Sequence, residues 1–177
     1  MSTYKEIVTK TVIGKGKKYF NNKYSLEAKE TPTTILGCWI INHKFNGKLN
    51  NNDVMVNGSF DVNLWYSYDN NTKTNVINET INYNDLINIK SRLNINKDSE
   101  IVVKALKQPE CINASINGNK IDFDIEKELG IEVVGDDKIK ILTEDNDEEW
   151  TNLNDLDEKV SEEIDNQVSE NTFDKNN

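Results

Sequence analysis

The sequence has 177 residues, with 21 Lys and Arg against 31 Asp and Glu, and therefore a formal net charge of −10 at pH 7. This length predicts one domain of ordinary size, and the negative charge disfavours binding to nucleic acid or to anionic lipid. No window approaches the ~20 apolar residues of a membrane span, and the first residues lack the apolar core of a signal peptide, so we expect a cytoplasmic chain without direct membrane insertion.

The first thirty residues are the basic part of the chain, at seven Lys against three Glu. Five residues there follow helical spacing: Tyr4, Ile7, Val8, Thr11 and Val12. Thr3 with Glu6 has the form of a capping box, and Gly14 offers a natural helix end. We therefore predict a short helix over residues 3–13, although the Thr and Val content also fits a strand, and treat 1–30 as a basic N-terminal helix and connector.

From residue 31 onward β-branched and aromatic residues replace helix formers, and apolar residues begin to alternate with polar ones. Residues 34–45 form an apolar run without charge until Lys44, which predicts a central strand covered on both faces and places Trp39 in the core. The alternation is clearest over residues 54–68. Because a strand of that length is unusually long, we expect a bulge at Gly58-Ser59.

Turn residues divide the rest of the body into further short strands. Asp69-Asn70-Asn71 and the Asn-Gly step at 117–118 are typical hairpin turns. The further predicted strands are 76–83, 100–106, 111–116, 120–125, 129–134 and 138–142, the last two separated by a turn at 135–137. About eight short strands with regular turns favour an antiparallel β-sandwich or a barrel over an α/β fold, so we predict a mainly-β body over 31–142.

The last segment, residues 143–177, carries most of the charge. It holds 13 acidic and two basic residues, a net of −11 against −10 for the whole chain, which leaves +1 on residues 1–142. Its residues with helical spacing are Leu153, Leu156, Val160, Ile164 and Val168. An amphipathic helix could therefore form on a partner, but alone in water we expect an acidic, flexible tail that recruits partners.

The residues that usually carry catalysis are scarce. His43 is the single histidine of the sequence, which excludes His-paired nucleophiles and multi-His metal sites. Paired carboxylates such as Asp122 and Asp124 arise readily on the solvated face of a strand. We therefore predict no catalytic site, no metal site, no cofactor and no enzymatic activity.

The two cysteines, Cys38 and Cys111, are too few for a disulfide framework and too far apart for the usual zinc spacings. The simplest interpretation is a pair of buried thiols. Under oxidising conditions they could also form intermolecular disulfides.

Aromatic residues mark one candidate contact surface. Trp65 is out of phase with the apolar face of its strand and lies beside Tyr66 and Tyr68 in the sequence. These side chains could form a contact surface, including a platform for glycan or peptidoglycan. The alternative for Trp65 is packing in a second core layer.

Several stretches carry distinctive strings of residues. They are ILGCWIINHKFNG at 35–47, VNGSFDVNLWYSYDNNTKT at 56–74, KQPEC at 107–111 and GNKIDFDIEKELGIEVVG at 118–135. In these strings, in the opening YKEIVTKTVIGKGKKY and in the acidic segment near residue 150, the chain resembles the CotE family of outer spore-coat morphogenetic proteins of endospore-forming bacteria. The resemblance extends from residue 4 to about 150.

The resemblance implies a non-enzymatic scaffold, made in the mother-cell cytoplasm, that becomes part of the spore coat. Its implied partners are further copies of itself in a homo-oligomer or array, inner basement-layer proteins and the outer spore-coat proteins that it recruits. In such proteins the body is associated with self-association and the acidic end with recruitment. The corresponding tail residues here are Asp147, Glu148, Glu149 and Trp150. A β-type module that binds glycan or peptidoglycan stays open as the alternative.

Overall fold

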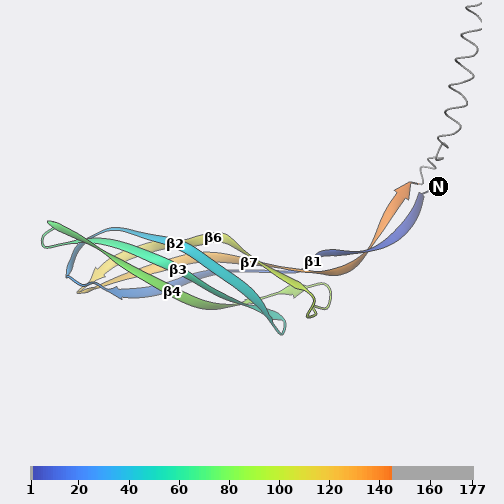
Figure 1. The fold of residues 1–177 in the computed structure, drawn as a ribbon, viewed down its shortest axis with the longest axis horizontal. Coiled ribbons are helices and arrows are strands. Elements are labelled where there is room, and N and C mark those ends of the chain that lie inside the picture. Colours follow the sequence, from blue (N-terminus) through green and yellow to red (C-terminus); the bar gives the residue numbers. More distant parts are fainter. Residues whose placement is uncertain (1, 145–177) are drawn as a thin grey trace, which may run out of the picture. The chain divides into compact units, whose positions relative to one another are not determined.

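The computed structural model describes residues 2–144. Residues 6–139 form one compact unit, and the described residues of a second unit are 2–5 and 140–144. The described residues form seven β-strands and no helix (Figure 1). The strands are β1 (Ser2–Glu27), β2 (Pro32–Asn50), β3 (Asp53–Tyr68), β4 (Lys73–Asn88), β5 (Lys90–Ser91), β6 (Glu100–Asn117) and β7 (Lys120–Glu144). The mainly-β prediction is therefore confirmed.

The strands form two sheets. The four-stranded sheet has the order β5-β1-β7-β6, and the three-stranded sheet has the order β2-β3-β4. After β4 the chain crosses from the three-stranded sheet to the four-stranded sheet, where β5 pairs with β1. Gly14 lies opposite Ser91 and Lys15 opposite Lys90. Strands β3 and β7, each flanked by a long strand on both sides, supply the centre of a sandwich-like arrangement.

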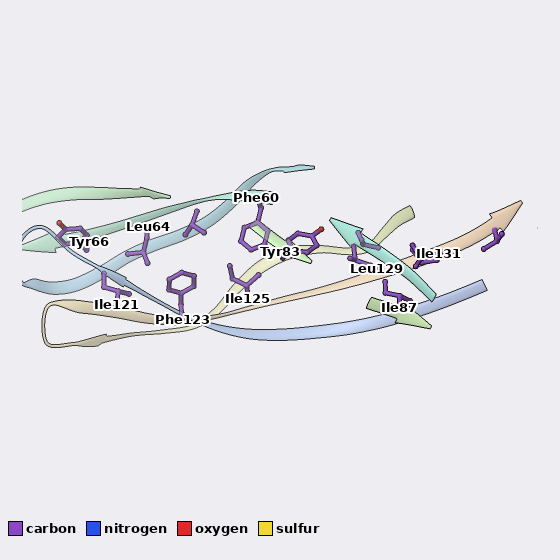
Figure 2. Close-up of a cluster of buried hydrophobic side chains, with 14 of the residues drawn as sticks. Phe60, Leu64, Tyr66, Tyr83, Ile87, Ile121, Phe123, Ile125, Leu129 and Ile131 are labelled. Carbon is purple, nitrogen blue, oxygen red and sulfur yellow. The ribbon is translucent and has the colours of Figure 1, made fainter. Parts of the chain in front are cut away.

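The core lies between β3 and β7, whose inward side chains alternate with solvated ones. Figure 2 shows Leu64 and Tyr66 pointing toward Ile121 and Phe123 of the other sheet. The buried apolar side chains of the two strands are Val54, Val56, Phe60, Val62, Leu64, Tyr66, Ile121, Phe123, Ile125, Leu129, Ile131 and Val133. Burial of one such side chain stabilises the fold by roughly 2 kcal/mol, so this double row dominates the stability.

One inward position of β7 holds a charged residue. Lys127 is 2% exposed, and its ammonium lies 3.0 Å from the Asp85 carboxylate of β4. The same ammonium lies 4.2 Å from the ring centre of Tyr83 and 4.7 Å from that of Phe20. A buried ammonium is tolerated where a carboxylate and aromatic faces replace its hydration. This ion pair links the two sheets through their interior.

The predicted helix over residues 3–13 is wrong, because these residues belong to β1, which pairs with β7. The β-branched residues of the segment are stiff at χ1 and suit a pleated strand better than a helix. Of the described side chains between Tyr4 and Ile13, Ile13 alone is fully buried. The helical spacing of apolar residues in this segment therefore did not indicate a helix face packed on the core. Backbone pairing with β7 holds the segment in the strand conformation instead.

The strands are longer and fewer than predicted. The expected turn at 135–137 is absent, and β7 runs without a break through the three strands predicted between 120 and 142. β6 likewise continues through Pro109, which lies at a register shift between Lys107 and Glu110. A proline is tolerated there because β6 is an edge strand and the shift leaves no ladder hydrogen bond to break.

Both predicted hairpin turns are confirmed. Asp69, Asn70 and Asn71 all have positive φ, between 53° and 64°, where β3 turns into β4. Gly118 has φ 61° in the turn between β6 and β7. Asn, Asp and Gly adopt this left-handed conformation with the least strain, which is why these turns were visible in the sequence.

Two expectations about the strands β2 and β3 are corrected. β2 is an edge strand, and Trp39 is 53% exposed rather than buried in the core. The bulge expected at Gly58-Ser59 lies on β2 instead, where the register shift leaves Asn42 and His43 opposite Phe60. Asn42 has φ 55°, so the extra residue is accommodated by a left-handed step in β2 while β3 stays regular.

Candidate interaction surface

The outward face of the three-stranded sheet carries exposed apolar side chains from all three strands. Strand alternation turns Leu64 and Tyr66 toward the core and therefore turns Trp65, between them, outward. Among the outward apolar side chains, Trp39 and Ile41 of β2 and Trp65 of β3 are exposed, and Val76 of β4 beside them is half-buried. We call these four residues the tryptophan face.

The two indoles of this face are neighbours. Trp65 is paired with Gly37 on one side and with Val76 on the other. A Cβ added at Gly37 would lie 2.3 Å from the ring of Trp39, so this indole lies directly on the Gly37 backbone and hence beside Trp65. Trp39 is 53% exposed and Trp65 41% exposed. The missing side chain at Gly37 thus allows two half-exposed indoles to share one flat surface.

A fixed carboxylate borders the tryptophan face. Asp61 pairs with Ile41 across β2 and β3, and its carboxylate accepts hydrogen bonds from Asn42 Nδ2 and Thr80 Oγ1, both at 2.7 Å. These two hydrogen bonds, the one from Asn42 first, lower the pKa of Asp61 and keep the carboxylate ionised. The border is therefore negatively charged and held in position by both neighbouring strands.

The outward face of the four-stranded sheet differs in chemistry. Its charged side chains pair with one another across strands β1, β6 and β7. The ion pairs are Lys15–Glu132 at 3.8 Å, Lys17–Glu128 at 3.6 Å, Lys104–Glu132 at 2.7 Å and Lys107–Glu126. Such exposed pairs contribute little free energy but keep the face hydrated. Contiguous exposed aromatic surface is the stronger sign of a contact site, so the tryptophan face is the candidate interaction surface.

The three aromatic residues singled out in the sequence do not form one platform. Trp65 faces outward, whereas Tyr66 is 1% exposed and its hydroxyl donates a hydrogen bond to Glu30 at 2.7 Å. Tyr68 is half-buried on the same side as Tyr66, with the ring centres 6.3 Å apart. The partner of Trp65 is instead Trp39, which the sequence interpretation had assigned to the core. Asp147, Glu148, Glu149 and Trp150 lie outside the described residues.

The His43 ring lies between side chains of the two sheets and interacts with both. Its Nδ1 lies 3.1 Å from Gln108 Oε1 and its Nε2 lies 2.6 Å from the Tyr83 hydroxyl. A neutral imidazole satisfies both contacts, because Nδ1–H donates to the amide oxygen and Nε2 accepts from the phenol. Burial, and then the nearby Lys127 charge, lower the pKa of His43, although the Gln108 hydrogen bond opposes this shift.

Acidification should therefore destabilise the fold through His43. The pKa is lower in the folded than in the unfolded chain, so the unfolded state takes up a proton first as the pH falls through about 6.5. We expect the urea midpoint to fall between about pH 7.5 and about pH 5.5, and to fall less in a His43→Gln variant. An equal fall in both proteins would contradict this role of His43.

The described residues offer little for other chemistry. Among residues 2–144, no group of three or more His, Cys, Asp or Glu side chains is arranged to hold a metal ion. No helix in this part of the chain is long and apolar enough to cross a membrane.

Comparison with known proteins gives one match. A family model described as outer spore coat protein E (CotE) matches residues 3–174. No curated protein matches the chain, and no solved structure does. The match covers all of the described strands except their first residue and continues through most of the acidic segment after them.

Proposed function

The chain belongs to the CotE family of spore coat proteins, and from that premise we propose that it is a non-enzymatic morphogenetic scaffold that self-assembles and recruits outer-coat proteins. It would be made in the mother-cell cytoplasm and assemble between an inner basement layer and the outer coat. Family membership supports the place in the spore coat, and the surface of the described strands supports a mode of assembly.

The observation that carries the proposal is the tryptophan face. Trp39 and Trp65 are half-exposed beside each other on a flat sheet surface, and tryptophan is among the side chains that contribute most to protein–protein contacts. A second copy of the chain presents the same face, so a two-fold contact would bury the four indoles together. Hydration of this surface is unfavourable in the free chain, which is the driving force we infer for pairing.

An array needs a second contact besides a two-fold one. β4 is an edge strand of the three-stranded sheet, and its outer edge presents backbone donors and acceptors that no described strand of that sheet pairs. Pairing of this edge with another copy would connect face-paired dimers into a sheet or filament. The scaffold would then need one apolar contact and one backbone contact per chain.

Assembly of the purified protein tests the proposal directly. We expect the sedimentation coefficient to rise with protein concentration and electron microscopy to show repeating assemblies. The assemblies should persist in moderate salt, because the contact that we propose is apolar rather than ionic. A protein that stays monomeric at every concentration would contradict the scaffold.

The acidic tail, residues 143–177, is the part that we propose to recruit outer-coat proteins. Its net charge is −11, and residues 1–142 carry +1, so the tail repels other tails more than it is drawn to the rest of the chain. Weak binding by one tail becomes effective when an array presents many copies. The body and the tail would thus divide assembly and recruitment between them.

Truncation after Glu144, the last residue of β7, should separate the two activities. The truncated protein should keep its unfolding midpoint and its self-association but lose the capture of purified outer-coat proteins on a surface coated with it. A full-length chain with the order of residues 145–177 scrambled is the matched control for charge alone. Unfolding of the truncated chain would show instead that the tail belongs to the folded body.

A module that binds glycan or peptidoglycan is the second candidate, favoured by two adjacent indoles beside the Asp61 carboxylate. Flat aromatic surface bordered by hydrogen-bond acceptors suits a sugar ring. Soluble peptidoglycan fragments should then shift the tryptophan fluorescence of the chain truncated after Glu144, whose indoles are Trp39 and Trp65. If the chain is a scaffold that does not bind glycan, the fragments should leave the tryptophan fluorescence of the monomeric protein unchanged.

A further inference from the structure

The edge strands of the two sheets contact each other along one side of the fold. β2 and β6 are neighbours in space although they belong to different sheets. At one end a Cβ added at Gly47 would lie 2.5 Å from Val103, and near the middle His43 Nδ1 lies 3.1 Å from Gln108 Oε1. Toward the other end Cys38 meets Cys111. We call this line of contacts the β2–β6 seam; side chains, not a backbone ladder, hold it together.

The two thiols face each other across this seam. Cys38 is paired with the buried Leu64 and Cys111 with the buried Ile125, so both sulfurs lie on the core-facing side of their strands. Both cysteines are free, half-buried and packed against the hydrophobic core. Along the seam Gly47 lies against Val103 and His43 against Gln108, so the two strands run in opposite directions and bring Cys38 and Cys111 to the same place, where their side chains interact.

Their interaction makes the two sulfurs chemically different. With Cys38 as the hydrogen-bond donor, the pKa of Cys111 is lowered, because its thiolate is stabilised, and the pKa of Cys38 is raised. A thiolate is the nucleophilic form of cysteine, so Cys111 is the sulfur that reacts first. Cys38 is in position to react with whatever forms on Cys111.

We propose that Cys38 and Cys111 are an oxidation site at which a peroxide converts the two thiols into an intramolecular disulfide that fastens β2 to β6. The Cys111 thiolate attacks one oxygen of hydrogen peroxide, the O–O bond breaks, and a sulfenic acid forms on Cys111 as the first water leaves. The Cys38 sulfur then attacks the Cys111 sulfur, and its proton leaves with the displaced hydroxide as the second water. Two thiols lose two electrons and two protons, and the peroxide is reduced to two waters.

Adjacent positions on two packed strands favour this pairing over a bond between chains. A thiol held beside its partner has an effective concentration far above that of a thiol on another molecule. Both sulfurs are also half-buried, which hinders the close approach of a second chain. The intermolecular cross-link that the sequence left open is therefore the slower reaction of the folded protein.

The bond would close a long loop. Cys38 and Cys111 are 73 positions apart, so the disulfide encloses most of β2 and of β6 together with all of β3, β4 and β5. Closing a loop of this length restricts the unfolded chain and should raise the thermal midpoint by roughly 10 °C. The β2–β6 seam, which lacks a backbone ladder, would become the covalently fixed side of the fold.

The test uses the purified full-length chain treated with hydrogen peroxide and then denatured in excess iodoacetamide. We expect a monomer that has lost two hydrogens and carries no alkyl group, with a peptide that joins Cys38 to Cys111. Its thermal midpoint should exceed that of the dithiothreitol-reduced chain by roughly 10 °C. Disulfide-linked dimers as the main product, two alkylated thiols, or an unchanged thermal midpoint would each overturn the proposal.

Single substitutions test the order of the reaction. Cys38→Ser should leave a sulfenic acid on Cys111 that dimedone labels, whereas Cys111→Ser should give no such label at Cys38 over the same time. Serine is close to cysteine in size, and the mass measurement on the unsubstituted chain does not depend on either variant folding. Faster labelling at Cys38 than at Cys111 would overturn the assignment of Cys111 as the attacking sulfur.

Discussion

Replacing Trp39 and Trp65 together with serine should raise the concentration at which the protein assembles by roughly 30-fold or more, since a central tryptophan contributes about 2 kcal/mol or more to an interface. The fold should survive, because both side chains point away from the core and are 53% and 41% exposed. Sedimentation across a concentration series measures the first effect and urea unfolding the second. The two readouts separate a lost contact from a lost fold.

Leu106 provides the matched control. It is also 53% exposed, but it lies on the four-stranded sheet, where its side chain covers Gly130. Leu106→Ser should leave assembly unchanged if the tryptophan face is the contact. An equal loss in this variant would point to general hydrophobic association, and unaltered assembly of the double tryptophan variant would exclude the face altogether.

Gly37→Ala tests the same surface without removing an aromatic group. The added methyl would lie 2.3 Å from the Trp39 ring, so the indole must leave its place on the sheet. Assembly should weaken although the number of exposed aromatic side chains is the same. This outcome would show that a flat pair of indoles, rather than exposed apolar area alone, makes the contact.

The sequence predicted the central strand β3 well because its burial follows from its own alternation. Strands β3 and β7 are flanked by long strands and bury most of their inward residues, so a period of two is visible in the chain. The hairpin turns were equally visible, since left-handed positions require Asn, Asp or Gly. These features depend on residues close together in the sequence.

Features that depend on distant neighbours were missed. The apolar run of β2 looked like a strand buried on both faces, but one of its faces packs on the core and the other forms part of the tryptophan face. Whether a strand lies at an edge is decided by the order of strands in the sheet, which local pattern does not contain. The approach of Cys38 to Cys111 depends in the same way on how β2 meets β6.

One signal was present and was not used. In β7 the inward positions are every second residue, and Lys127 falls on this series between Ile125 and Leu129. A lysine there interrupts the hydrophobic pattern, which is why one strand was predicted to end at 125 and another to begin at 129. Continuing the alternation through the lysine would have predicted a buried ammonium and hence a buried acidic partner.

That partner is Asp85, and removing its charge should be strongly destabilising. Asp85→Asn leaves the ammonium of Lys127, 2% exposed, without the carboxylate that lies 3.0 Å away. Loss of one member of a buried ion pair costs about 3–5 kcal/mol. Urea unfolding should show this as a lower midpoint with an unchanged slope, because the surface exposed on unfolding stays the same. A loss below about 1 kcal/mol would show that water reaches the pair.

Two further variants distinguish the pair from its two charges. Lys127→Met with Asp85→Leu removes both charges, keeps an apolar side chain against Tyr83 and Phe20, and should recover most of the loss, because apolar replacements of buried pairs are often neutral or stabilising. Lys17→Met breaks an exposed pair with Glu128 and should cost less than about 1 kcal/mol. If the double variant is as unstable as Asp85→Asn, the ion pair itself, and not the avoidance of an unpaired charge, stabilises the contact between the sheets.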